Sequence, residues 1–195
     1  YLVIGAHYDH VGMGGLGSLA PGTMEIHNGA DDNASGTAVL LEVARRLASG
    51  HAEVGEQTAQ ATARRSIILI AFTGEERGLL GSKYFVRNPR WPLERTVAML
   101  NMDMVGRVDK KYGNDPDYIY VIGSDKLSQD LHEINESINA RYTKLKLDYT
   151  YNDEKDPNRY YYRSDHYNFV EQGIPAIFYF SGTHEDYHRP SDTID

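Results

Sequence analysis

The run of apolar residues at Ser66–Thr73 (SIILIAFT) constrains the fold of this chain more than any other feature of the sequence. An unbroken apolar run of this length, rich in isoleucine, is typical of a strand that is buried on both faces of a parallel sheet. Further short apolar segments predict additional strands, and 145–149 is a weaker candidate. The predicted strands besides Ser66–Thr73 are 2–6, 97–104, 117–122 and 175–180.

Helical patterns fill the gaps between these strands. In Ser35–Ala48 apolar residues recur at a spacing of about 3.6, and Asn33 or Ser35 can cap the start of the helix. The remaining helical segments are 78–87, 164–172 and 126–139, the last with Leu127, Leu131, Ile134 and Ile138 expected to face the core. Strands that alternate with helices in this way predict an α/β fold, a mostly parallel sheet with helices on both faces.

Length and composition indicate one domain and exclude several classes of protein. The 195 residues suit a single domain, and the polar stretches at 52–63, 108–117 and 151–160 are surface loops too short to link domains. The net charge of −8 argues against a nucleic-acid-binding domain and against binding to an anionic membrane surface. The chain has no cysteine, which excludes a disulfide scaffold, a cysteine-ligated zinc site and a thiol nucleophile.

The longest apolar run, 67–72, is far shorter than the roughly 20 residues that a membrane-spanning helix needs. Because the chain opens directly on a predicted strand, we expect a segment of the protein to precede Tyr1.

Histidines and carboxylates follow the predicted strands at the point where each strand ends. His7, Asp9 and His10 follow the first strand, and Glu75 and Glu76 follow the second. Asp103 ends the 97–104 strand, the segment after 175–180 carries His184 and His188, and Asp31 and Asp32 precede the first helix. In open α/β sheets ligands bind beyond the carboxyl ends of the strands. The sequence therefore predicts that these side chains meet there.

Histidine and carboxylate together are the ligand set of zinc, manganese or cobalt in hydrolytic sites. A carboxylate shared by two ions would create a two-metal site that activates water. Such a site also needs a base that is not itself a ligand. The Glu75–Glu76 pair offers one carboxylate to bind metal and one to take a proton.

Each of these residues also has an ordinary structural interpretation. Asp31 and Asp32 suit the start of a helix, Glu75–Glu76 resembles a charged turn, and His7 and His188 alone would be common histidines. Asp103 is harder to explain in that way, because a lone carboxylate within an apolar strand is costly unless it is paired. His10 and His166 are candidates for either the site or its support.

Six motifs together resemble Peptidase family M28, the co-catalytic zinc aminopeptidases, in the order of that family and over nearly the whole chain. They are GAHYDH (5–10), NGADDNASG (28–36), FTGEERGLLGS (72–82), NMDM (101–104), SDH (164–166) and DYHRPSDT (186–193). The resemblance implies a three-layer αβα sandwich with a mostly parallel central sheet. It also implies a single M28-type peptidase domain over 1–195 with a phosphorylase/hydrolase-like zinc peptidase fold.

The resemblance also implies roles for individual residues. His7 and Asp103 match the ligands of one zinc, Glu76 and His188 match those of a second, and Asp31 matches the carboxylate that bridges them. Glu75 matches the general base, and Tyr187 a phenol that stabilises the oxyanion in some members. Asp9 resembles the carboxylate that orients a ligand histidine. Because members often have a cis peptide after the bridging aspartate, strain is expected at Asp31–Asp32, and Tyr160, Tyr161 and Tyr162 are candidates to line the substrate pocket.

The implied activity is hydrolysis of N-terminal residues from peptides, with two Zn²⁺ or other divalent ions as cofactors and peptides as partners. A carboxypeptidase for acidic dipeptides and a glutaminyl cyclase are the alternatives, and a non-catalytic receptor-type domain is a third. The resemblance favours a secreted or periplasmic location. Side-chain specificity, native metal and oligomeric state do not follow from the sequence.

Overall fold

A six-stranded sheet forms the centre of the protein in a computed structural model that describes residues 1–49 and 65–194. The predicted loop at 52–63 lies outside these residues. The strands are ordered β2-β1-β3-β6-β4-β5 across the sheet. Their bounds are β1 Leu2–His7, β2 Ile67–Phe72, β3 Ala98–Met102, β4 Tyr118–Ile122, β5 Lys146–Asp148 and β6 Ala176–Phe180.

The sheet is mostly parallel, as predicted. β2, β1, β3 and β6 run in one direction, whereas β4 pairs with β6 in antiparallel register and with β5 in parallel. Only the carboxyl ends of β1, β2, β3 and β6 therefore meet at one edge of the sheet. The prediction that 145–149 holds a strand is confirmed by β5, which is three residues long.

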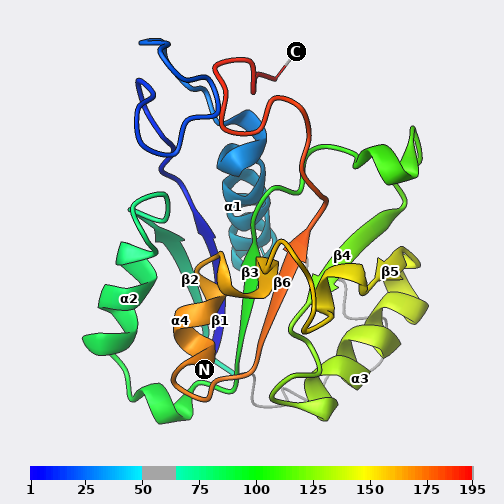
Figure 1. Ribbon diagram of the computed structural model, residues 1–195. Coiled ribbons are helices and arrows are strands. Elements are labelled where there is room, and N and C mark those ends of the chain that lie inside the picture. The colour runs from blue at the N-terminus through cyan, green and yellow to red at the C-terminus, as the bar shows by residue number, and fades with distance from the viewer. Residues whose placement is uncertain (50–64, 195) are drawn as a thin grey trace.

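Helices flank the sheet on both faces (Figure 1). Helix α1 (Gly36–Ala48) lies against β1, β2 and β3 on one side, and α4 (His166–Val170) packs with α2 (Leu80–Arg87) on the other. Helix α3 (Gln129–Ile138) lies beside β4 and β5. No helix in the described ranges has the length and apolar character needed to cross a membrane.

Neighbouring residues of β1 supply the cores on the two faces, because successive side chains of a strand point to opposite sides. Ile4 packs with Leu40 of α1, and Val3 packs with Phe72 and Phe169 on the side of α2 and α4. A third cluster of tyrosines and phenylalanines covers β4 and β6, with Tyr120 fully buried at its centre.

Two expectations about burial are wrong. β2 is an edge strand, and its Ile67 and Leu69 are 39% and 37% exposed, so the apolar run does not mark a strand buried on both faces. An apolar run cannot distinguish an edge strand from a central one, because its residues are the same in both.

The apolar stripe of α3 does not face the sheet, since Leu127, Ile134 and Ile138 are 46–59% exposed. Instead, the polar side of the helix faces inward. Asn135 accepts a hydrogen bond from the Tyr179 hydroxyl at 2.7 Å, and Glu136 accepts one from the Tyr149 hydroxyl at 2.5 Å. The hydroxyls of Tyr179 on β6 and of Tyr149, which directly follows β5, thus bind the polar face of this helix.

The long connection from β1 to α1 and the segment after β6 lie together beyond the carboxyl ends of the strands (Figure 1). The Leu19 amide donates to the His188 carbonyl at 2.9 Å, and the Asn28 side chain donates to the Pro190 carbonyl at 2.8 Å. These contacts close the edge at which the predicted ligands gather.

Phe169 provides a test of the core between the sheet and α4. It is fully buried, with its ring centroid 6.1 Å from that of Phe72 and 5.7 Å from that of Phe85. Phe169→Ala is expected to lower the free energy of unfolding by about 3–5 kcal/mol, measured by urea denaturation. Tyr84→Ala, at a site 70% exposed, should change it by less than about 0.5 kcal/mol, and equal losses would contradict this packing.

Candidate metal centre

Four strand ends deliver the side chains of the site. His7 is the last residue of β1, and its backbone pairs in register with Phe72, the last residue of β2. Glu75 and Glu76 follow β2, Asp103 directly follows β3, and the segment after β6 returns His188 to the same edge. Parallel register therefore places residues from distant parts of the sequence side by side.

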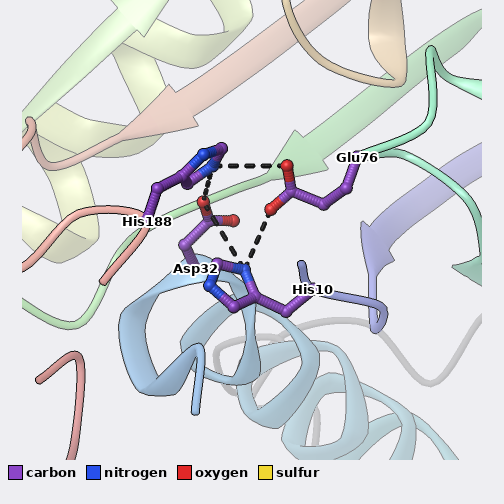
Figure 2. A group of neighbouring side chains, drawn as sticks. All are labelled: His10, Asp32, Glu76 and His188. Atoms are coloured by element: carbon purple, nitrogen blue, oxygen red, sulfur yellow. Dashed lines mark ion pairs between the residues drawn. The ribbon is translucent and has the colours of Figure 1, made fainter. Parts of the chain in front are cut away.

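His10, Asp32, Glu76 and His188 form one group of possible metal ligands (Figure 2). The His188 Nε2 atom lies 3.0 Å from Asp32 Oδ2 and 3.2 Å from Glu76 Oε2. The His10 Nδ1 atom lies 2.9 Å from Glu76 Oε1 and 3.9 Å from Asp32 Oδ2. One ligand atom from each residue lies within 4.8 Å of those of the others.

His7, Glu75 and Asp103 form a second group. The His7 ring is almost fully buried, and its Nε2 lies 3.2 Å from Asp103 Oδ1. The other carboxylate oxygen of Asp103 accepts a hydrogen bond from the Ser164 hydroxyl at 2.6 Å. This second contact fixes the direction in which Asp103 presents its first oxygen.

Asp32 lies between the two groups. Its Oδ1 is 3.3 Å from His7 Nε2, and its Oδ2 is 3.0 Å from His188 Nε2. The expectation that Asp31 occupies this position is wrong. Asp31 Oδ1 accepts the Gly106 amide at 2.7 Å, and its Oδ2 lies 3.4 Å from His184 Nε2, away from both groups.

The two aspartates reach different partners because the backbone of the Ala30–Ser35 turn leaves helical geometry at Asp32, with φ −102° and ψ 90°. The cis bond expected after Asp31 is found one residue later, between Asp32 and Asn33.

Asp192 holds the backbone of this turn. Its carboxylate is fully buried and accepts hydrogen bonds from the amides of Asp31 and Asp32, each at 3.1 Å. Arg107 lies 3.5 Å from the same carboxylate and also binds Asp186 at 3.0 Å. A charged pair from two other segments of the chain therefore sets the position of Asp32.

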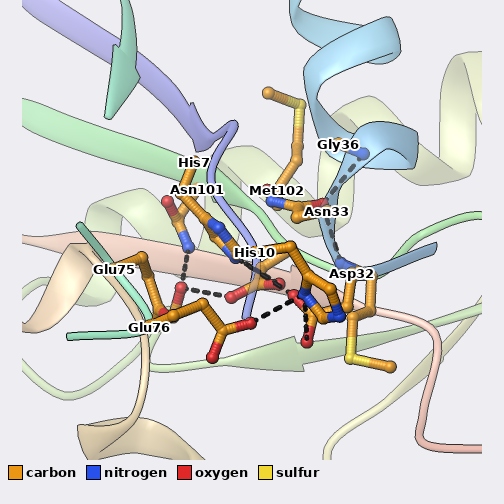
Figure 3. Close-up of polar contacts among 12 residues, drawn as sticks. His7, His10, Asp32, Asn33, Gly36, Glu75, Glu76, Asn101 and Met102 are labelled. Atoms are coloured by element: carbon orange, nitrogen blue, oxygen red, sulfur yellow. Dashed lines mark hydrogen bonds and ion pairs between the residues drawn. The ribbon is translucent and has the colours of Figure 1, made fainter. Parts of the chain in front are cut away.

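Asn33 connects the same turn to α1 and to β3 (Figure 3). Its Oδ1 accepts the amides of Gly36 at 3.0 Å and Met104 at 3.1 Å, and its Nδ2 donates to the Met102 carbonyl at 3.0 Å. The predicted cap of the helix by Asn33 is thus present, and the same side chain fixes Asp32 relative to the end of β3.

Asp9 supports both His7 and the glutamate pair, but not in the way expected. The His7 Nδ1 atom contacts the backbone carbonyl of Asp9 at 3.0 Å, whereas the carboxylate of Asp9 is 3.8 Å away. That carboxylate accepts the amides of Glu75 at 3.1 Å and Glu76 at 3.3 Å. A ring that donates from Nδ1 keeps a lone pair on Nε2, the atom that faces Asp32 and Asp103.

The donor atoms of the two groups fit a cation. Although His10 Nδ1 and Glu76 Oε1 are 2.9 Å apart, neither atom has a hydrogen bond, and His10 Nε2 has none either. Burial opposes the charged form of His188, yet its contacts with Asp32 and Glu76 raise its pKa to about 10. Without a metal the site therefore favours a proton there. Convergent lone pairs of histidine and carboxylate are the donor set of zinc.

Glu75 differs electrostatically from Glu76. Burial raises the pKa of Glu75 well above its usual value, and the nearby charges of Asp103, Asp165 and Glu76 add to this, although His7 opposes it. The pKa of Glu76 is lowered, because its contacts with His10 and His188 outweigh burial. Glu75 is thus the carboxylate better suited to hold a proton.

A cavity of about 300 Å³ opens onto both groups. It is lined by Asp32, Glu75, Glu76, Asp103 and His188 of the two groups and by apolar residues that include Leu79, Met104, Tyr160, Phe178 and Phe180. Tyr187 and Arg163 also line it, and the Arg163 Nη2 donates to the Tyr187 hydroxyl at 3.2 Å. The cavity combines charged donors with space for an apolar side chain.

A model of Peptidase family M28 matches residues 1–195, the full length of the chain. The chain belongs to Peptidase family M28. It is 31% identical over 199 residues to a probable leucine aminopeptidase of Arthroderma otae, covering 100% of this chain and 48% of that protein.

Solved structures of named aminopeptidases have the same fold. The LapA aminopeptidase of Legionella pneumophila matches with a TM-score of 0.73 and 27% identity, covering 100% of this chain and 45% of that one. BSAP, a zinc aminopeptidase from Bacillus subtilis, matches with a TM-score of 0.69 and 29% identity, covering 99% and 40%. This M28 chain thus spans about half the length of the curated relatives it matches.

The sequence left open whether His10 and His166 belong to the site, and the structure of this M28 chain places them differently. His10 lies in the first group, whereas His166 is fully buried, donates to the Tyr161 carbonyl at 2.8 Å and has its pKa lowered by burial to about 3. Asp165 had no predicted role, yet it is fully buried and burial raises its pKa to about 7. The sequence feature that could have pointed to Asp165 is its place in the SDH motif (164–166).

Asp32 and Asp31 provide a matched pair to test the centre. Asp32→Asn is expected to weaken zinc binding by at least about tenfold, because it removes a charge that faces both groups. Asp31→Asn should change it far less, since an amide oxygen can still accept the Gly106 amide. Competition with a chromophoric chelator measures both, and a larger loss in Asp31→Asn would contradict the placement.

Proposed function

We propose that this chain carries the catalytic site of a metal-dependent aminopeptidase that binds two zinc ions and removes N-terminal residues from peptides. The observation that carries the proposal is the position of Asp32, whose two carboxylate oxygens face two separate groups of histidine and carboxylate. Membership of the M28 family and the similarity to a zinc aminopeptidase structure support it.

In this proposal His7 and Asp103 hold one ion, Glu76 and His188 hold the other, and Asp32 bridges them. His10 is a further donor beside Glu76. When bound, zinc supplies Lewis-acid activation of a water molecule and of the peptide carbonyl.

Glu75 acts as the general base and then as the general acid. Its carboxylate accepts a proton from the attacking water, and the same carboxyl group later donates that proton to the nitrogen of the leaving amine. Its raised pKa suits this exchange, because the group must both hold and release a proton. Its amide is fixed by Asp9, which keeps the side chain at the edge of the cavity.

In this proposal Tyr187 stabilises the oxyanion that forms at the carbonyl. Burial raises the pKa of its phenol, so the hydroxyl stays protonated and is able to donate. Because the Tyr187 oxygen accepts a hydrogen bond from Arg163, its own proton is free to point elsewhere. The ring lies beside His188, with the two centroids 3.9 Å apart.

The cavity has room for the N-terminal residue of a peptide. In this proposal the ions neutralise Asp32, Glu76 and Asp103, so a free α-amine would be held at the metal centre and by the nearby carboxylates rather than by an uncompensated negative wall. The apolar residues that line the cavity would receive the side chain of the N-terminal residue.

Glu75→Gln is expected to lower kcat by about 10²- to 10⁴-fold, because the amide cannot accept the proton of water. Zinc affinity should stay close to that of the unmodified chain. The assay is mass spectrometry of a peptide pool with free and acetylated N-termini, and acetylation should also block cleavage.

Glu76→Gln is the matched control and should lose zinc affinity together with activity, since it removes a ligand. Removal of C-terminal residues or ring closure at an N-terminal glutamine would overturn the aminopeptidase proposal. Full activity in Glu75→Gln would overturn the role of Glu75 while leaving the metal site in place.

A further inference from the structure

Arg163 is the only arginine or lysine among the described residues that line the cavity. It directly precedes Ser164, which hydrogen-bonds Asp103, so its backbone is tied to the second ligand group. The arginine comes from the segment between β5 and α4, whereas Glu75 and Glu76 follow β2. Arg163 is an exposed residue, so its positive charge stands where the cavity meets solvent.

The guanidinium of Arg163 is held in place without being neutralised. Its Nη2 donates to the Tyr187 hydroxyl at 3.2 Å, and its central carbon lies 5.0 Å from the ring centroid of Tyr160. Within residues 1–49 and 65–194 it forms no ion pair, whereas Arg107 pairs with both Asp186 and Asp192. Most of its five N–H donors therefore remain available to a ligand.

We propose that Arg163 binds a carboxylate of the substrate close to the scissile bond, so that the site prefers substrates that carry one there. This inference rests on the proposed aminopeptidase function. Two sources have the required chemistry: the C-terminal carboxylate of a dipeptide, and the acidic side chain of an N-terminal aspartate or glutamate.

The charge of Arg163 explains why this residue would determine the preference for substrates with a carboxylate. In the zinc-loaded chain Asp32, Glu76, Asp103 and His188 are committed to the ions, so Arg163 is the remaining charged group among the described cavity residues that can compensate a substrate carboxylate. A guanidinium presents two parallel N–H groups that match a carboxylate in a bidentate contact. The stacking on Tyr160 reduces the freedom that the arginine would lose on binding.

A different role for Arg163 would act only through Tyr187. In that case loss of the arginine changes the turnover of every substrate by the same factor, because the phenol contacts the reacting carbonyl and not the carboxylate. The ratio between a substrate with a carboxylate and its uncharged analogue separates the two roles.

The test compares two matched substrate pairs in the zinc-loaded chain. Leucyl-glycine and leucyl-glycinamide differ only in the C-terminal carboxylate, and the p-nitroanilides of glutamate and glutamine differ only in the side chain. Arg163→Gln is expected to lower the ratio of kcat/KM between the carboxylate member of one pair and its uncharged partner by about tenfold, mainly through KM. Loss of the contact with Tyr187 changes both members by a common factor, which cancels in this ratio. The affected pair identifies the source.

Arg163→Lys should show a smaller loss of the preference for a carboxylate than Arg163→Gln, since lysine keeps the positive charge but lacks the two parallel N–H groups of the guanidinium. Arg159→Gln is the matched control, because Arg159 stacks on Tyr162 at 4.7 Å but does not line this cavity. Its ratios should equal those of the unmodified chain.

A second readout does not depend on turnover. Calorimetry with the Glu75→Gln chain should show tighter binding of the same carboxylate ligand, by about tenfold, and Arg163→Gln added to it should abolish the difference. Unchanged ratios and equal binding would overturn the inference even where all substrates are cleaved. Absence of cleavage with the calorimetric difference present would instead overturn the proposed aminopeptidase function.

Discussion

The hydrogen bonds from the amides of Asp31 and Asp32 to the buried carboxylate of Asp192 are the contact on which the site depends. They join the turn before α1 to a segment about 160 positions later in the chain, the same segment that carries His188. Asp32 can face both ligand groups only while this turn keeps its direction. The distance between its two partners, His7 and His188, is thus set by contacts outside the ligands themselves.

The accumulation of negative charge is the second constraint. Asp32, Glu75, Glu76 and Asp103 approach one another in a largely buried space, and uncompensated buried charges are unstable. Histidine offsets part of this negative charge, because Asp32 and Glu76 raise the pKa of His188 and so favour its protonated form. Asp9 and Asp192 accept hydrogen bonds from backbone amides, which fix the positions of Glu75, Glu76 and Asp32. Because these amides are neutral, they do not offset the negative charge of the site. A divalent cation is the group that resolves the remaining excess.

Much of the fold could be predicted from the sequence, because the positions of the apolar strands and of the helices between them follow from local patterns. The order of the strands across the sheet does not. The meeting of His7, Glu76, Asp103 and His188 also followed, since the carboxyl ends of parallel strands share one edge. The choice between Asp31 and Asp32 did not follow, because it depends on the direction of one turn that is fixed by the distant Asp192. The prediction of which face of α3 points inward was wrong for a similar reason, because the hydroxyls of Tyr149 and Tyr179, far from the helix in sequence or in another element, bind its polar side.

Arg163 shows how the support of the site and its selectivity are connected. One residue on, the Ser164 hydroxyl orients Asp103, and through Tyr187 the arginine also contacts the group proposed to stabilise the oxyanion. A carboxylate that binds the guanidinium would share it with the Tyr187 hydroxyl, so recognition of the substrate and placement of the phenol would change together. The proposed zinc site would hold the free amine, and Arg163 offers a carboxylate a separate partner among the residues that line the same cavity. A short or acidic peptide would satisfy both contacts at once.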